Sequence, residues 1–226
     1  MTILFLVRHA SNDFVQEGKL AGWLPDIHIN DAGRQQAEQM AARMSQVELD
    51  AIYSSPLERA VETAQYLAQP RGLKVQPRTR LGEIKIGAWE NRKIEELKQT
   101  DEWRMYHIYP SGARPPQGET ARELQMRAVD EVEAICAAHP EGTVAIVSHA
   151  DTIAAIVAHY AGIHLDLFQR LAVSPASVTV FSIGPWGPRL LRFNDAGPLE
   201  EIKPPHPPLQ KQNDPGKEAK NALSGV

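Results

Sequence analysis

Cysteine is almost absent from this chain of 226 residues. The single cysteine, Cys136, lies within a helical pattern and has no second cysteine to pair with, so an internal disulfide bond is excluded. Cysteine usage therefore gives no sign of an oxidising compartment. We expect Cys136 to be a small residue of the hydrophobic core.

An excess of charge of one sign is also lacking. Lys and Arg total 24, Asp and Glu total 28, and the formal net charge is -4, with both signs mixed along the sequence. A protein that binds the phosphate backbone of nucleic acids needs a basic face. The composition therefore predicts no nucleic-acid partner.

Long hydrophobic runs are missing as well. The first apolar run, at residues 3–7, is too short for the hydrophobic part of a signal peptide or for a membrane span. We therefore expect no membrane association and a cytoplasmic location.

What the chain does contain is enough apolar sequence, 42% of its residues, to bury one substantial core. From residue 197 onward the composition changes to many prolines and few large apolar side chains. Such a segment cannot bury enough surface to offset the entropy lost on ordering. We expect one catalytic domain at 1–196 and a proline-rich, flexible tail at 197–226.

Short runs rich in Val, Ile and aromatic residues alternate with helical patterns along the first part of the chain. This alternation predicts an α/β fold of three layers, α/β/α, with a doubly wound and mostly parallel sheet. Gly and Pro residues at 184–188 predict a hairpin between the last two strands, so at least one strand should be antiparallel. The expected strands are 3–7, 50–54, 73–76, 143–148, 177–183 and 189–193, and the expected helices are 31–47, 57–68, 121–138 and 150–160.

Helix ends carry their own signals. Asn30 or Asp31 is suited to cap the start of the first long helix, and Gly162 is suited to end the last one. Thr120 and Glu123 have the spacing of a capping box, in which each side chain bonds the backbone of the other residue.

Two histidines stand at the ends of expected strands far apart in the sequence. His9 follows Arg8 at the end of the first strand, and His149 follows a late strand. Ligands of open α/β sheets bind at the carboxyl ends of the strands. The pair therefore indicates one site assembled from both halves of the sheet.

The residue types near these histidines suit a phosphate monoester, which carries about two negative charges at neutral pH. Arg8 and Arg59 are permanent cations whose planar groups match phosphate oxygens. His149 would add a further donor, together with backbone amides at the start of its helix. His9 could attack phosphorus through a neutral ring nitrogen if a backbone acceptor held its other nitrogen.

Four segments together resemble the histidine phosphatase superfamily, also called the phosphoglycerate mutase-like family. The segments are 6–10, 53–64, 81–90 and 147–150, and the similarity extends over residues 3 to about 194. The resemblance implies a phosphatase in which the histidine of the first motif, here His9, is phosphorylated and then hydrolysed by water. It also implies a small phosphorylated metabolite as the substrate and neither metal nor cofactor.

The third segment supplies the candidate acid. Glu83 would protonate the leaving oxygen and later help water to attack phosphohistidine, although Glu58 and Glu90 lie near the same motifs and remain alternatives. We therefore expect His9, Glu83 and His149 to be catalytic. Arg8, Arg59 and Asn12 are expected to bind the substrate.

Departures from the family pattern bear on the reaction. Ala10 replaces the usual glycine after the Arg-His pair, and Val15 replaces a polar residue of the mutases. The longer insertion of the cofactor-dependent mutases is not found between Glu83 and His149. Hydrolysis is therefore favoured over a phosphoglycerate mutase-type transfer, and the sequence leaves the oligomeric state open, a homodimer included.

Two rival interpretations remain. Two histidines and a glutamate could bind zinc in a metal-assisted hydrolase, although Arg8 beside His9 disfavours a dication. Alternatively, the domain could be a non-catalytic phosphate-binding scaffold, which the retention of every candidate catalytic residue argues against.

The segment 101–119 looks too irregular for the core. We interpret it as a lid over the site, with a rigid packed loop as the alternative. The side chains expected to set specificity are Arg104, Tyr106, His107 and Arg114.

Overall fold

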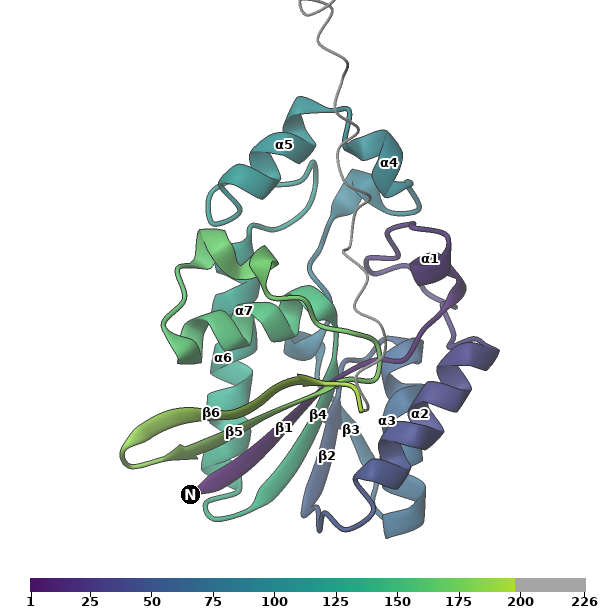
Figure 1. Cartoon of the computed structure of the whole chain (residues 1–226). Helices are drawn as coiled ribbons and strands as arrows, with labels where there is room; N and C mark the ends of the chain where they lie inside the picture. The colour runs from purple at the N-terminus through teal and green to yellow at the C-terminus, as the bar shows by residue number, and fades with distance from the viewer. Residues whose placement is uncertain (198–226) are drawn as a thin grey trace, which may run out of the picture.

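A computed structural model describes residues 1–197 and contains one six-stranded sheet (Figure 1). The strand order is β3-β2-β4-β1-β5-β6; β1 to β4 are parallel, β5 is antiparallel to β1, and β6 is antiparallel to β5. The predicted mixed sheet and its final hairpin are therefore confirmed. The strands are β1 (Thr2–Arg8), β2 (Ala51–Ser54), β3 (Val75–Pro77), β4 (Thr143–Ser148), β5 (Val178–Gly184) and β6 (Gly187–Asp195).

Helices cover both faces of the sheet, which gives the three predicted layers (Figure 1). Alternate residues of β4 show why. Val144 and Ile146 pack in the core under α6 and α7, whereas Ala145 and Val147 pack in the core under α2 and α3. The α-helices are α1 (Asp13–Gln16), α2 (Asp31–Arg43), α3 (Glu58–Ala68), α4 (Ile94–Leu97), α5 (Asp101–Ile108), α6 (Ala121–Ala138) and α7 (Ala150–Ala161). Short 3-10 helices span Gln69–Arg71, Thr79–Leu81, Gly87–Trp89 and Leu165–Arg170.

Three predicted helix caps are present in the structure. The Asn30 side chain accepts a hydrogen bond from the Gly33 amide at the start of α2. Thr120 and Glu123 form the complete capping box of α6. Gly162 ends α7 in the left-handed conformation that favours glycine.

One helix end differs from the prediction, because α2 stops at Arg43 rather than at residue 47. The guanidinium of Arg71 donates to the backbone carbonyls of Met44 and Val47 just beyond the end of the helix. The end of α2 is thus set by an arginine from a distant segment, and local periodicity carries no sign of it.

The segment 101–119 also differs from the prediction. Its first half is helix α5, and the side chain of Thr100 caps the N-terminus of this helix. Tyr106, within the helix, is buried in the core. Figure 1 places α4 and α5 above the carboxyl ends of the parallel strands. The expectation of an irregular segment outside the core is therefore wrong, and the packing of Tyr106 agrees with the alternative of a rigid, packed segment.

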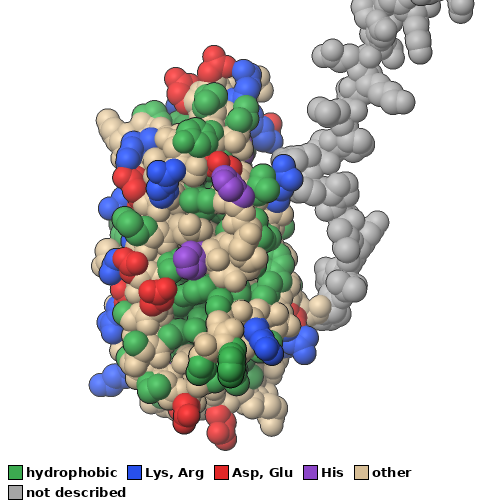
Figure 2. Space-filling model, turned by 90° about the vertical axis from the view of Figure 1, so that its left-hand side faces the viewer, with side chains coloured by type: hydrophobic (Ala, Val, Ile, Leu, Met, Phe, Trp, Pro, Cys, Tyr) green, Lys and Arg blue, Asp and Glu red, His purple; other side chains and the backbone are tan. Residues whose placement is uncertain are grey.

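Cys136 is partly buried against the core under α6 and α7. Figure 2 shows charged side chains of both signs interspersed on the left-hand side of the molecule as drawn in Figure 1. Among residues 1–197, no helix combines the length and the apolar character needed to cross a membrane. The predicted tail lies, from residue 198 on, outside the described residues.

Candidate active site

His9 and His149 meet because β1 and β4 are neighbouring parallel strands that end at the same level. Arg8 pairs with Ser148 in the sheet register, and the His9 amide donates to the Ser148 carbonyl at 2.8 Å. The two imidazole rings lie with their centres 5.1 Å apart, and both side chains are buried. The predicted assembly of one site from both halves of the sheet is therefore present in the fold.

The surroundings of His9 fix its protonation. Its Nδ1 lies 2.8 Å from the carbonyl oxygen of Ala10, to which it donates, so Nε2 is the unprotonated nitrogen. Burial lowers the pKa of His9 well below its usual value, and the charges of Arg59 and Arg8 lower it further. At neutral pH the ring is thus an uncharged base with a free lone pair.

Two guanidinium groups lie beside this ring, each held by a backbone carbonyl. Arg8 donates to the carbonyl of Val173 at 2.5 Å, and Arg59 donates to that of Gly22 at 2.8 Å. Nε of Arg8, and Nε and Nη1 of Arg59, are buried and find no hydrogen-bond partner in the described part of the chain. Buried donors of this kind are costly unless a ligand binds them.

Ser55, at the end of β2, orients His149. The Ser55 hydroxyl lies 2.7 Å from Nε2 of His149 and accepts a hydrogen bond from the Leu57 amide at 3.3 Å. The hydroxyl can donate its own proton to Nε2, and in that tautomer the His149 proton lies on Nδ1. Nδ1 is buried and meets no acceptor within hydrogen-bond distance among residues 1–197. The sequence motifs alone did not predict that Ser55 orients His149.

The oxygen and the nitrogen of the Asn12 side chain have different roles. Its side-chain oxygen caps α1 by accepting from the Val15 amide at 2.9 Å. Its side-chain nitrogen is buried and without a hydrogen-bond partner in the described chain, and Asn12 lines the same cavity as Arg8 and His9. The amide is therefore fixed with its donor unused.

Glu83 lines the same cavity as His9 and lies beside His149. Its Oε2 is 3.8 Å from Nδ1 of His149, and its Oε1 accepts from the Ile84 amide at 2.8 Å. Burial raises the pKa of Glu83 to about 7, and the charge of Asp151 adds to the rise. Such a carboxyl group can both give and take a proton at neutral pH. Neither Glu58 nor Glu90 lines the cavity.

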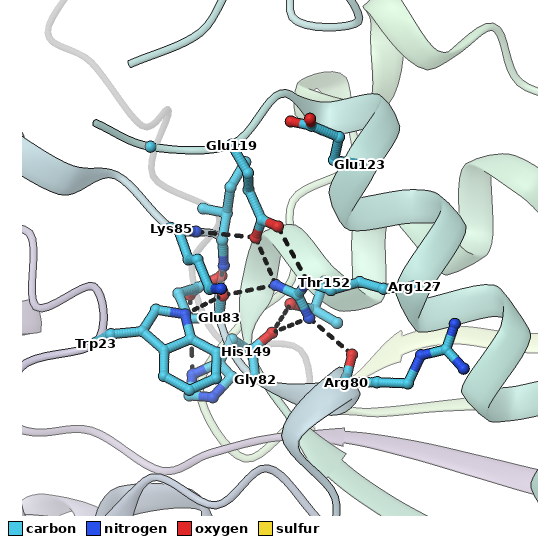
Figure 3. Close-up of polar contacts among 12 residues, drawn as sticks. Trp23, Arg80, Gly82, Glu83, Lys85, Glu119, Glu123, Arg127, His149 and Thr152 are labelled. Carbon is cyan, nitrogen blue, oxygen red and sulfur yellow. Dashed lines mark hydrogen bonds and ion pairs between the residues drawn. The ribbon is translucent and has the colours of Figure 1, made fainter. Parts of the chain in front are cut away.

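The loop that carries Glu83 is held from α6 (Figure 3). Arg127 donates to the carbonyls of Arg80, Gly82 and Glu83 at 2.7, 3.0 and 2.7 Å. Glu119 pairs with Arg127 at 2.6 Å and accepts from the backbone amide of Lys85 at 2.9 Å. This cluster, which we call the Arg127–Glu119 clasp, ties both sides of the Glu83 loop to one helix.

A cavity of about 240 Å³ is lined by Arg8, His9, Asn12, Arg59 and Glu83, with His149 buried directly behind His9. The first residues of α7, Ala150 and Asp151, line it too, so the start of a helix faces the same space. Asp151 was not among the predicted residues, and its position two residues after His149 was the available signal. Burial raises the pKa of Asp151, whereas the charges of Arg8 and His107 oppose the rise.

The four expected specificity residues separate into two pairs. Tyr106 and His107 line a second cavity of about 430 Å³, which Asp151 also lines. Arg104 pairs instead with Asp101 at 2.7 Å, and Arg114 pairs with Glu123 at 2.7 Å. Neither arginine lines either of these two cavities.

A zinc site would need several metal-binding side chains close together. No three His, Cys, Asp or Glu side chains of residues 1–197 are grouped closely enough to hold a metal ion. In addition, the guanidiniums of Arg8 and Arg59 repel a dication at the cavity. The donor set of this cavity suits an anion.

The chain was compared with known proteins. It is 31% identical over 182 residues to phosphoserine phosphatase 1 of Hydrogenobacter thermophilus, covering 80% of this chain and 86% of the relative. It is 30% identical over 183 residues to the 2,3-bisphosphoglycerate-dependent phosphoglycerate mutase of Thermoplasma acidophilum, covering 81% and 88%. A solved phosphoserine phosphatase mutant from Entamoeba histolytica, in complex with phosphoserine, superposes with a TM-score of 0.80 and 26% identity, covering 87% of this chain and 98% of that one.

A family model also matches most of the chain. It is the model of the histidine phosphatase superfamily (branch 1), and it matches residues 4–196. The match spans every strand from β1 to β6 apart from the first two residues of β1. The chain belongs to the histidine phosphatase superfamily, branch 1.

Proposed function

We propose that this protein is a phosphomonoester hydrolase that works without a metal and forms a phosphohistidine at His9. The observation that carries the proposal is the uncharged His9 ring, whose free Nε2 shares one cavity with unused buried donors of Arg8, Arg59 and Asn12. Residues 1–196 would form the catalytic domain. The substrate would be a small phosphorylated metabolite.

In the first step the phosphate oxygens bind Arg8, Arg59, Asn12 and Nδ1–H of His149. Nε2 of His9 attacks phosphorus, and the bond from phosphorus to the ester oxygen breaks. Glu83 gives its proton to that oxygen, so the alcohol leaves uncharged. The guanidiniums bind the oxygens as charge redistributes in the transition state.

In the second step water replaces the alcohol. Glu83, now a carboxylate, takes a proton from the water as its oxygen bonds to phosphorus. The bond between phosphorus and Nε2 breaks, and its electron pair returns to His9. Inorganic phosphate leaves, and Glu83 is again protonated.

Two observations favour hydrolysis over transfer of the phosphoryl group to another molecule. The longer insertion of the mutases is not found between Glu83 and His149, and the chain is similar to phosphoserine phosphatase 1. Similarity to a phosphoglycerate mutase keeps transfer as the second candidate. In that case the phosphoryl group of His9 would pass to an acceptor hydroxyl instead of water.

The test compares the wild type with His9→Ala on a panel of phosphomonoesters, with excess chelator present. We expect an acid-labile phosphoenzyme and phosphate release in the wild type only. A loss of at least ~10³-fold in kcat is expected for the variant. Equal turnover by both proteins would remove His9 from the mechanism.

Two further arms separate the rivals. Activity that is lost with chelator and restored by zinc would support the metal-assisted hydrolase instead. Phosphoryl transfer to added glycerate at a rate comparable with hydrolysis would support the mutase. His159→Ala is the matched control, because His159 lies on α7 and lines neither cavity.

A further inference from the structure

The second cavity adjoins the first one beneath helix α5. Five residues line both cavities, so the two spaces share a wall. These residues are Leu20, Ile86, Ile94, Ala150 and Asp151. A phosphate bound against His9 would therefore leave the rest of its substrate facing the second cavity.

The walls of this second cavity are mostly apolar and aromatic. Trp89, Trp103 and Tyr106 form a cluster in which Trp89 lies 5.3 Å from Trp103 and 5.5 Å from Tyr106, measured between ring centres. Leu20, shared with the first cavity, extends the apolar surface. Walls of this kind favour an apolar group through surface burial and ring contacts.

Polar groups with unused bonding capacity also face the second cavity. The Tyr106 hydroxyl is buried and has no hydrogen-bond partner within residues 1–197. Nδ1 of His107 lies 2.8 Å from the Trp103 carbonyl, so it donates there and Nε2 is left as an acceptor in the neutral ring. The Asp151 side chain forms no ion pair with another described residue.

Each lysine that lines one of the two cavities is paired with a glutamate. Lys98, which lines the second cavity, pairs with Glu95 at 2.6 Å. Lys19, which lines the first, pairs with Glu17 at 2.5 Å. The charge of Arg8 favours the carboxylate form of Asp151 against the effect of burial. An amine on the leaving group would therefore find an acceptor there, whereas a carboxylate would meet a like charge with no unpaired lysine lining either cavity.

We propose that the second cavity is the leaving-group site, and that it selects a bulky, largely apolar or aromatic alcohol carrying a hydrogen-bond donor that faces Asp151. Trp89, Trp103 and Tyr106 contact the apolar part. A compact acid such as glycerate or serine fits this site poorly. This inference rests on the proposed phosphatase function and adds the substrate class to it.

The test uses four phosphate esters of primary alcohols, which separate the effect of an aromatic ring from the effect of an amine. Propyl phosphate has neither feature, 3-phenylpropyl phosphate has the ring, O-phosphoethanolamine has the amine, and phenylalaninol phosphate has both. We expect kcat/KM to rise at least ~10-fold on adding the ring and again severalfold on adding the amine. 3-Phosphoglycerate and phosphoserine should lie below phenylalaninol phosphate.

Variants then assign the preference to residues. Asp151→Asn should bring the ratio of kcat/KM between phenylalaninol phosphate and 3-phenylpropyl phosphate close to one. This ratio is independent of any general loss of activity or of folded protein. Met105→Ala on the same helix as Tyr106 is the control, because Met105 is exposed and lines neither cavity, and it should leave every ratio unchanged.

The outcomes distinguish this inference from the function on which it rests. If all esters are hydrolysed through a phosphoenzyme but the ring gives no gain, or a compact acid is preferred, the leaving-group proposal is overturned and the phosphatase remains. An amine preference that survives in Asp151→Asn would remove Asp151 from the site. If no ester gives a phosphoenzyme, the proposed function itself fails.

Discussion

At the residue scale, the site depends on which nitrogen of each imidazole holds the proton. The Ala10 carbonyl leaves His9 with a free Nε2, whereas Ser55 leaves His149 with a donor at Nδ1. One histidine can therefore act as a nucleophile while the other binds an oxygen. The sequence predicted a backbone anchor for His9, because its attack needs one. It contained no comparable signal for Ser55, whose contact depends on where β2 lies beside β4.

Glu83 gives a prediction on pH dependence. Its pKa is raised to about 7, so the acid form that protonates the leaving group is present below that pH and lost above it. We expect kcat/KM for 3-phenylpropyl phosphate to fall as the pH rises through about 7. The pKa of His9 is lowered, so its ring stays neutral over the same range and does not change the pH profile of kcat/KM there.

Glu83→Gln is the variant for this prediction. It should remove the alkaline limb and lower kcat/KM ~10²- to 10⁴-fold for the alkyl ester. p-Nitrophenyl phosphate is the control substrate, because its leaving group needs no proton. Its loss in kcat/KM, which reports formation of the phosphoenzyme and not its later hydrolysis, should be much smaller. A limb near pH 7 that persists in Glu83→Gln would show that another group supplies the proton.

At the element scale, α6 stabilises the site without touching the substrate cavity. The capping box fixes where the helix begins, and Arg127 then reaches three carbonyls of the Glu83 loop through the clasp (Figure 3). The sequence predicted the helix and its start from Thr120 and Glu123. It could not predict the clasp, because an arginine on an amphipathic helix most often faces solvent.

Arg127→Met tests the clasp as a positioning device. The variant leaves Glu119 and three loop carbonyls without their donor, so Glu83 should lose its fixed orientation. We expect kcat/KM for 3-phenylpropyl phosphate to fall ~10-fold or more, mainly through kcat, whereas kcat/KM for p-nitrophenyl phosphate should fall much less.

The control for this variant is Arg122→Met, because Arg122 is an exposed residue of the same helix. It should change neither substrate's kcat. An equal loss of activity on both substrates in Arg127→Met would mean that the clasp serves folding alone.

Helix α5 marks the limit of prediction at this scale. The strands and the four long helices could be predicted because their apolar residues repeat with a regular period, and β4 was placed at its observed bounds. Segment 101–119 has no such period, yet Tyr106 is buried against Trp89. Its helix depends on contacts with the rest of the core, which a single sequence does not reveal.

At the scale of the whole molecule, the sheet order creates the site. β1 and β4 are far apart in the sequence and become neighbours only when β4 inserts between β2 and β1. His9 and His149 could be predicted as a pair because each follows a strand that ends at one edge of the sheet. Arg59 was predicted from its permanent charge and from the family resemblance. The second cavity could not be predicted, since it is lined by residues of both α5 and α7, whose packing a single sequence does not show.

The same assembly places a costly group in the interior, which leads to a prediction on stability. Arg59 is 1% exposed, and two of its nitrogens have no hydrogen-bond partner in the described chain. Replacing a buried, poorly paired ion by an apolar side chain of similar size often stabilises a protein. We expect Arg59→Met to raise the free energy of unfolding by about 1–3 kcal/mol, and the Tm by about 2–10 °C.

Phosphate should reverse this order, because a ligand stabilises only a protein that binds it. At about 100 times its Kd, phosphate should stabilise the wild type by about 2.7 kcal/mol and leave Arg59→Met unchanged. Arg71→Met is the control, because the Arg71 guanidinium binds the carbonyls of Met44, Val47 and Leu67. That variant should unfold at a lower temperature and still respond to phosphate. Thermal unfolding with and without phosphate measures all three proteins, and an Arg59→Met protein that is less stable yet still stabilised by phosphate would contradict the role of Arg59 as the buried cation of an anion site.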